Sequence, residues 1–130
     1  MALNILVVDD SSTVRAVIAK TLRLADVPIN QLYEAANGEE ALRVVATQWV
    51  DLIFSDINMP VMGGVEMVER MKDDALLSSI PIVIVSTEGS ATRIDELMSK
   101  GVRAYIRKPF TPESVRSVVD DIIGLSHGSE

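Results

Sequence analysis

The chain has 130 residues, no cysteine and a formal net charge of −7. This length fits one domain with a buried core, and the lack of cysteine excludes disulfides, thiolate metal sites and cysteine nucleophiles. The negative charge argues against binding to nucleic acid or to an anionic membrane surface. No apolar run approaches the length of a membrane-spanning helix, and the first residues lack the basic start of a signal peptide.

Short apolar runs alternate along the chain with segments of helical periodicity. The predicted strands are 4–8, 32–35, 52–55, 80–85 and 104–107. The predicted helices are 14–25, 39–49, 65–73, 91–100 and 112–123, followed by a short polar tail from about residue 124. Strict alternation implies right-handed crossovers and a parallel sheet with helices on both faces. We therefore expect an α/β fold and a single domain over residues 1–130, which the initial Met1 and the short tail suggest to be a complete chain.

Several residues mark where the predicted helices begin and end. Asp10 or Ser11 can cap the first helix, and Thr111 can cap the last, with a proline at its first position. Gly101 is expected as the cap after the fourth helix. Trp49 is expected to pack at the end of the second helix and Met98 to face inward from the fourth. The only histidine, His127, lies in the predicted tail and is expected to be inert.

Polar side chains follow four of the five strands, at the edge where the carboxyl ends of parallel strands meet. These side chains are Asp9 and Asp10, Asp56, Ser86 and Thr87, and Lys108. Carboxylates held close together repel one another unless a cation neutralises them. Mg²⁺ is a hard cation that accepts carboxylate and carbonyl oxygens, and Lys108 adds a second positive charge. This set suits phosphoryl transfer onto a carboxylate, and strand position favours Asp56 as the acceptor.

With these residues in order, the chain resembles the receiver domains of two-component response regulators, and most closely the single-domain chemotaxis (CheY-type) regulators. The resemblance covers residues 3–123 and is carried by Val7–Ser11, Glu34–Gly38, Asp56–Gly64, Val85–Ser86 and Tyr105–Phe110. Each motif alone is weak, but their order and spacing together are specific. The family implies a flavodoxin-like, doubly wound, five-stranded parallel sheet in the order 2-1-3-4-5 with five helices.

The resemblance also implies a role for each residue at that edge. Asp56 would be the phosphoacceptor, and Lys108 would contact the phosphoryl group. Mg²⁺ would be held by Asp10, Asp56 and the main-chain carbonyl of Asn58, with Asp9 acting through water. The bond between Lys108 and Pro109 is commonly cis in the family.

Five further residues are implied to switch or tune the response. Counting from Pro81 and from Gly101 places Ser86 in the slot of the family's switch hydroxyl and Thr87 in a slot usually held by a small residue. Tyr105 matches the aromatic residue that changes rotamer on activation. Asn58 and Glu88 match positions that tune hydrolysis and resemble the chemotaxis pairing, which suggests a short-lived phosphoryl group.

The resemblance predicts a signalling protein that catalyses only its own phosphorylation and dephosphorylation. A histidine kinase would be the phosphodonor, and a surface of helix 4, strand 5 and helix 5 would engage a downstream protein, for example a flagellar motor switch or another chemotaxis component. We expect a cytoplasmic monomer. One alternative is a Mg²⁺-dependent phosphohydrolase with an aspartyl-phosphate intermediate, but Asn58 replaces the acid/base aspartate that it needs. Another is a degenerate interaction module, which would have lost one of the acidic residues or Lys108.

Overall fold

The computed structural model describes residues 2–87, 91–108 and 111–127, which form five strands and five helices in strict alternation. The strands are β1 (Leu3–Val8), β2 (Ile29–Ala35), β3 (Leu52–Ser55), β4 (Ile82–Ser86) and β5 (Ala104–Arg107). The helices are α1 (Ser12–Leu24), α2 (Gly38–Thr47), α3 (Gly64–Lys72), α4 (Ala91–Ser99) and α5 (Pro112–His127). The predicted alternation is therefore confirmed.

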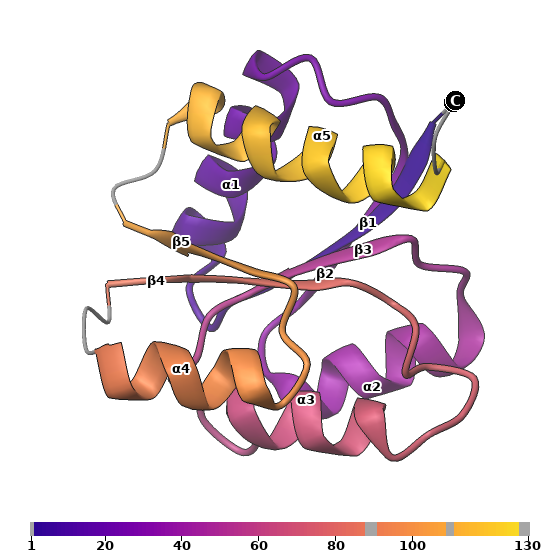
Figure 1. Cartoon of the computed structure of the whole chain (residues 1–130), viewed down its shortest axis with the longest axis vertical. Helices are drawn as coiled ribbons and strands as arrows, with labels where there is room; N and C mark the ends of the chain where they lie inside the picture. The colour runs from indigo at the N-terminus through magenta and orange to yellow at the C-terminus, as the bar shows by residue number, and fades with distance from the viewer. Residues whose placement is uncertain (1, 88–90, 109–110, 128–130) are drawn as a thin grey trace.

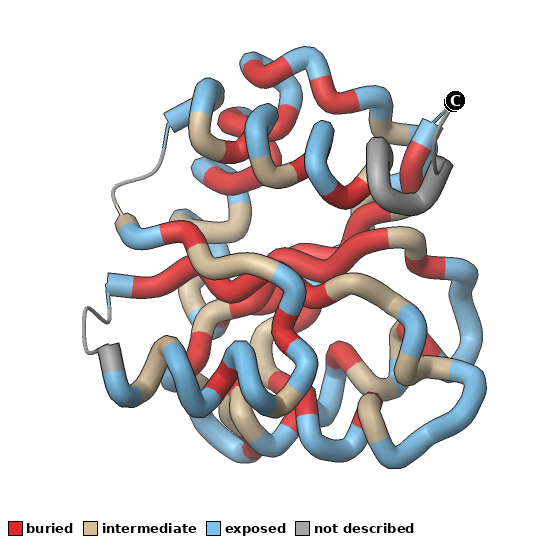
Figure 2. The backbone as a smooth tube through the Cα atoms, viewed as in Figure 1, coloured by how far each residue is buried: buried red, intermediate tan, exposed pale blue. Residues whose placement is uncertain are grey.

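The strands form one parallel sheet in the order β2-β1-β3-β4-β5. Helices α1 and α5 cover one face of this sheet, and α2, α3 and α4 cover the other (Figure 1). Each face has its own buried apolar cluster. The central strands β1, β3 and β4 are buried almost throughout, as Figure 2 shows, because helices cover both of their faces. The predicted doubly wound, flavodoxin-like sheet is confirmed.

Chain order changes direction at β1 and β3. From β1 the chain moves outward to the edge strand β2, then crosses back past β1 to β3 and continues to β5. Ligand crevices in open parallel sheets lie beyond the carboxyl ends of the two strands at such a reversal. The fold thus directs attention to the residues that directly follow Val8 and Ser55, the last residues of β1 and β3.

Two helix caps and one glycine follow the predicted local chemistry. The Ser11 side chain accepts a hydrogen bond from the Val14 N–H, so Ser11 rather than Asp10 caps α1. The Thr111 hydroxyl accepts a bond from the Ser114 N–H at the start of α5. Gly101 follows α4 with a φ of 100°, a left-handed conformation that favours glycine.

Some predicted boundaries and orientations are wrong. β2 starts at Ile29 rather than residue 32, because an edge strand needs no continuous apolar run. α5 continues to His127, so the expected tail from residue 124 is helical; one glycine near a helix end weakens a helix without stopping it. Trp49 lies beyond the end of α2 and is 77% exposed, and Met98 is also exposed.

Candidate functional site

Three carboxylates meet at the edge of the sheet where β1 and β3 end. The register pairs Val8 with Ser55, which places Asp9 and Asp56 side by side as the next residues of the two strands. Asp9, Asp10 and Asp56 each offer a carboxylate oxygen, and the three oxygens lie within 4.8 Å of one another. Asp9 is buried, Asp56 is half-buried and Asp10 is exposed. Like charges at this spacing repel one another, so the cluster favours a cation.

Main-chain hydrogen bonds hold two of these carboxylates in place. The Ser11 N–H donates to Oδ1 of Asp9 at 2.9 Å, and the Ile57 N–H donates to Oδ1 of Asp56 at 2.7 Å. The backbone is fixed as well, because the Asp56 N–H continues the sheet by donating to the Val8 carbonyl at 3.0 Å. These bonds restrict the directions in which the remaining carboxylate oxygens point.

Lys108 supplies the positive charge at this edge. Its Nζ lies 3.4 Å from Oδ2 of Asp9 and 3.6 Å from Oδ2 of Asp56, and its side chain is 19% exposed. Lys108 directly follows β5, and its N–H donates to the Ser86 carbonyl at 2.8 Å. One amine therefore faces two of the three carboxylates, which leaves the group with a net negative charge.

The loop from β3 to α3 packs tightly against the Asp56 backbone. The Gly64 N–H donates to the Ile57 carbonyl at 2.7 Å, and a Cβ atom at Gly64 would lie only 2.4 Å from the Asp56 carbonyl oxygen. A side chain at the first residue of α3 would thus displace the backbone that carries Asp56. Val61, in the same loop, has a φ of 66°, which is unusual for a β-branched residue.

Sequence reasoning missed Arg15. Its guanidinium donates to the Asp9 carbonyl at 2.6 Å and to the Glu34 carboxylate at 2.8 Å, and so joins α1 to the ends of β1 and β2. Arg15 lies off the apolar stripe of α1, yet its side chain is only 17% exposed. A usable signal exists, because helical side chains tilt toward the helix N-terminus and Arg15 lies one turn beyond the Ser11 cap.

Comparison with known proteins identifies the family to which this chain belongs. Residues 5–120 match the model of the response regulator receiver domain. This chain belongs to the response regulator receiver family. It is 36% identical over 128 residues to a chemotaxis protein CheY homolog of Campylobacter jejuni, with 97% of this chain and 96% of that protein covered. It is similar in structure to the chemotaxis response regulator CheY4 of Vibrio cholerae, with a TM-score of 0.82, 32% identity and coverage of 94% and 99%.

A more distant likeness is to the receiver domain of a sensor histidine kinase from Pseudomonas aeruginosa, which has a magnesium ion coordinated in its active-site cleft. That structure has a TM-score of 0.82 and 22% identity, with 95% of this chain and 99% of that chain covered, so it shows the fold alone. Receiver domains are phosphorylation-activated signalling modules, and the acidic cluster of this receiver domain is compatible with Mg²⁺. Within the described residues, no helix is long and apolar enough to cross a bilayer.

The remaining predicted residues of the receiver domain lie around this edge. Ser86, predicted as the switch hydroxyl, is the buried last residue of β4, and Thr87 is exposed. Asn58 is exposed in the loop after Asp56. Tyr105 on β5 is half-buried against the apolar cluster under α2–α4. Their roles stay predictions, and Glu88 and Pro109 lie outside the described residues.

Proposed function

We propose that this receiver domain accepts a phosphoryl group on Asp56 from the phosphohistidine of a histidine kinase, in a Mg²⁺-dependent reaction. The observation that carries the proposal is the setting of the Asp56 carboxylate. One oxygen is held by the Ile57 N–H, the other faces the Lys108 amine, and two further carboxylates lie within 4.8 Å. The side chain is 16% exposed, which leaves it accessible to a donor.

The donor set fits Mg²⁺, which prefers oxygen ligands and keeps several waters. Asp10, Asp56 and the main-chain carbonyl of Asn58 would hold the ion directly. Asp9 would act through water, because its side chain is only 3% exposed, whereas that of Asp56 is 16% exposed. When bound, Mg²⁺ supplies positive charge for the phosphoryl oxygens.

Residues of this chain would supply the nucleophile, stabilise the charge of the transferring group and hold the nucleophile in place. A carboxylate oxygen of Asp56 attacks phosphorus, the phosphorus–nitrogen bond of the donor breaks, and its electron pair stays on the imidazole of the kinase. Lys108, already beside Oδ2 of Asp56, stabilises the charge spread over the transferring group. The Ile57 N–H fixes Asp56 before the reaction, so little reorganisation is required.

The proposal also covers how phosphorylation of Asp56 would change the surface formed by α4, β5 and α5. Ser86 and Lys108 would be drawn toward the new phosphoryl oxygens, and Tyr105 would turn inward. The surface of α4, β5 and α5 would then engage a downstream protein, such as a flagellar motor switch or another chemotaxis component. In this proposal the protein acts as a monomer in the cytoplasm. Such a change is a population shift between two states, biased by a few charge-assisted contacts.

The test is incubation with acetyl phosphate and MgCl₂, followed by intact mass spectrometry. The native chain should gain the mass of one phosphoryl group, and Asp56→Asn should gain none. Trp49 fluorescence is not a suitable readout, because Trp49 lies at the other end of β3 from Asp56. Lack of an adduct on the native chain would overturn the proposal, and rapid turnover of varied phosphate esters would indicate a hydrolase instead.

A further inference from the structure

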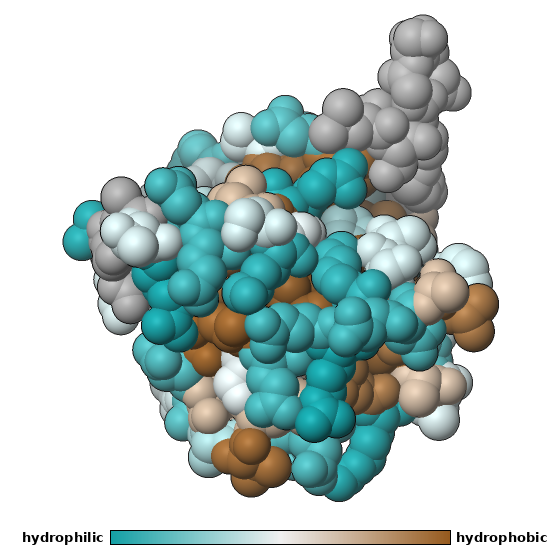
Figure 3. All heavy atoms as spheres, turned by 60° about the horizontal axis from the view of Figure 1, so that its bottom comes forward, coloured by the Kyte–Doolittle hydropathy of each residue, from teal (hydrophilic) through white to brown (hydrophobic). Residues whose placement is uncertain are grey.

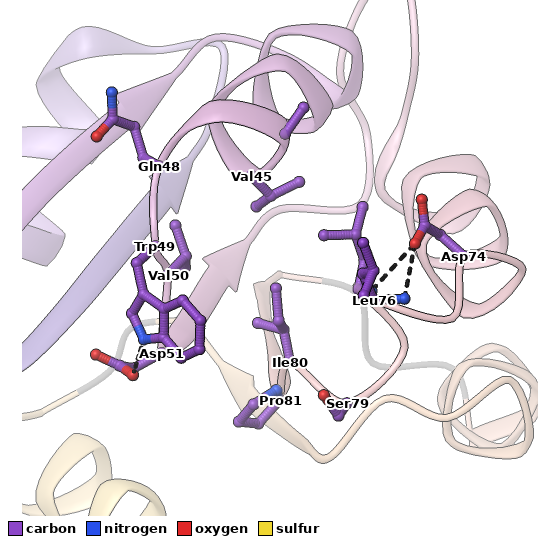
Figure 4. Close-up of a pocket in the computed structure, with 12 residues that line it drawn as sticks. Val45, Gln48, Trp49, Val50, Asp51, Asp74, Leu76, Ser79, Ile80 and Pro81 are labelled. Atoms are coloured by element: carbon purple, nitrogen blue, oxygen red, sulfur yellow. Dashed lines mark hydrogen bonds between the residues drawn. The ribbon is translucent and has the colours of Figure 1, made fainter.

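A pocket of about 640 Å³ lies at the opposite edge of the sheet from the acidic cluster. Its walls come from the last turn of α2 and the segment that follows it, and from the segment between α3 and β4. Trp49 and Asp51 lie on one side, Leu76 and Asp74 lie on the other, and Ile80 and Pro81 lie between them (Figure 4). Strand β3 (Leu52–Ser55) separates this pocket from Asp56.

Both walls of the pocket are held by aspartate side chains. Oδ1 of Asp51 accepts a hydrogen bond from the Trp49 indole N–H at 2.9 Å, and its Oδ2 accepts one from the Asn4 N–H at 2.8 Å. Across the pocket, Oδ1 of Asp74 accepts bonds from the N–H groups of Leu76 and Leu77 at 2.8 and 3.3 Å. The indole is therefore fixed to the start of β3 and the leucine to a tight turn, so an occupant would meet walls that are already ordered.

The two apolar walls are unusually exposed for their residue types. Trp49 is 77% exposed and Leu76 is 87% exposed, and neither covers the other. Hydrophilic residues predominate on the outer surface of the α2–α4 layer, and apolar residues appear there as separate small patches (Figure 3). Tryptophan is enriched among the energetically dominant residues of protein interfaces, and here it lies exposed across an apolar floor from an exposed leucine.

The negative charge of the pocket favours a positively charged partner segment. Two carboxylates line it, no lysine, arginine or histidine is among its lining residues, and the exposed Asp73 adjoins Asp74. We propose that this pocket docks a segment of a partner protein that inserts one large apolar side chain between Trp49 and Leu76 and carries a lysine or arginine beside it. A second copy of this chain fits poorly, since an isologous contact would bring the same carboxylates together.

This docking site goes beyond the proposed phosphorylation. Its residues share no side chain with the acidic edge, so docking leaves Asp56, Asp10 and Lys108 free. Partner binding at the pocket should therefore not depend on phosphorylation, and phosphorylation by acetyl phosphate should not depend on the pocket.

The experiment uses the single tryptophan of the chain, which is itself a wall of the pocket, as the reporter. The probe is the peptide acetyl-Lys-Phe-Leu-Lys-amide, titrated into the native protein with Trp49 fluorescence and backbone amide shifts as readouts. A saturable change confined to the pocket is expected, and the acidic control acetyl-Glu-Phe-Leu-Glu-amide should bind about fivefold more weakly or worse. No saturable change, or equal binding of the acidic peptide, would overturn the proposal.

Two variants separate docking from non-specific attraction. Leu76→Ser removes an exposed wall and should weaken the basic peptide about fivefold without lowering the unfolding midpoint. Asp74→Asn keeps the Oδ1 acceptor of the turn but removes the charge, and should weaken the same peptide and reduce its salt dependence. Leu24→Ser, at an exposed leucine of α1 outside the pocket, is the control and should bind as the native chain does.

Two results would contradict the pocket as a partner site. One is Leu76→Ser binding the basic peptide as tightly as the native chain. The other is a shift of the Trp49 and Leu76 signals with protein concentration in the absence of peptide, which would identify a second copy as the occupant. Phosphorylation of Leu76→Ser by acetyl phosphate should match that of the native chain, so failure of the docking proposal is distinguishable from failure of the Asp56 proposal.

Discussion

At the scale of single residues, the acidic edge combines fixed carboxylates with one movable cation. Asp9 and Asp56 are held by main-chain N–H groups, whereas Lys108 reaches them from the end of β5 through a flexible side chain. The lysine is thus the member of the group whose side chain can move toward the oxygens of a phosphoryl group on Asp56. It would also oppose the proposed binding of Mg²⁺, because both cations are attracted to the same carboxylates.

This competition gives the first prediction. Lys108→Met should bind Mg²⁺ about threefold to tenfold more tightly, because a like charge beside the metal site is removed. The same variant should be phosphorylated by acetyl phosphate at least about tenfold more slowly, because the cation beside Oδ2 of Asp56 is lost. Calorimetric titration with MgCl₂ and the time course of intact mass measure the two effects.

The control for Lys108→Met is Lys100→Met, which makes the same change in net charge. Lys100 pairs with Glu69, outside the acidic edge, and the pKa of its amine is raised by that hydrogen-bonded carboxylate. Mg²⁺ affinity should be unchanged in this variant. Equal tightening in both variants would mean that total charge, not the position of Lys108, sets the affinity.

Backbone strain at Val61 gives a second prediction at the residue scale. Its φ of 66° is unfavourable for a β-branched side chain, and the side chain is 76% exposed, so it contributes little burial. The Met62 N–H donates to the Pro60 carbonyl at 2.7 Å, so Val61 is the central residue of a strained γ-turn. Val61→Asn should raise the free energy of unfolding by about 1 kcal/mol, because a positive φ is less unfavourable for asparagine than for a β-branched residue. Urea unfolding measures the change. Val17→Asn, at an exposed valine in α1, should change stability by less than about 0.5 kcal/mol, and an equal gain there would remove the strain argument.

At the scale of elements, the start of α3 is set by how closely it approaches the loop after β3. A Cβ atom at Gly64 would lie 2.4 Å from the Asp56 carbonyl oxygen and 3.1 Å from the Ile57 Cα. Gly64→Ala should lower the free energy of unfolding by about 2 kcal/mol and should slow phosphorylation, because the backbone that carries Asp56 must move. Arg70→Ala, on the exposed side of α3, should cost no more than about 0.5 kcal/mol. Equal values for the two variants would show that the loop yields freely.

Arg15 connects α1 to the ends of β1 and β2, the strands before and after this helix. In Arg15→Met the Asp9 carbonyl loses its half-buried hydrogen-bond donor, so the free energy of unfolding should fall by about 1–2 kcal/mol. A double-mutant cycle with Glu34→Gln should give a coupling energy of about 0.5–1 kcal/mol, because Arg15 is mostly buried although Glu34 is exposed. The exposed Arg70 and Glu66 pair in α3 is the matched control, with an expected coupling of about 0.3 kcal/mol. A cycle no stronger for Arg15 than for Arg70 would contradict a role in holding these elements together.

These elements also show what the sequence could and could not predict. Continuous apolar runs fixed the central strands, and Ser11 and Thr111 marked helix starts through chemistry that is local to the chain. The start of β2, the exposure of Trp49 and Met98 and the course of α5 past Gly124 depend on which neighbour an element meets, and periodicity carries no such information. The acidic cluster was predictable because strand ends share one edge, whereas the contacts of Arg15 with Asp9 and Glu34 depend on packing.

At the scale of the whole molecule, folding brings three negative charges together at one edge of the sheet, where a bound cation would offset their repulsion. The chain carries a net charge of −7, and three of its carboxylates are forced together by the ends of two central strands. Folding therefore creates a repulsion that the unfolded chain does not have, and a cation that binds only the folded edge should relieve it. Stability of the whole domain should consequently depend on Mg²⁺, although the ion would touch only one edge of the sheet.

This dependence is the last prediction. At a Mg²⁺ concentration about one hundred times its dissociation constant, the free energy of unfolding should rise by about 2.7 kcal/mol, because the ligand binds only the folded state. Urea unfolding in MgCl₂ and in NaCl of equal ionic strength separates this effect from general screening of the net charge. In Asp10→Asn, which removes the exposed carboxylate of the cluster without changing its size, most of the difference between the two salts should disappear. An equal gain in both salts for the native chain would mean that screening alone stabilises the fold, and that the three carboxylates do not form a specific Mg²⁺ site.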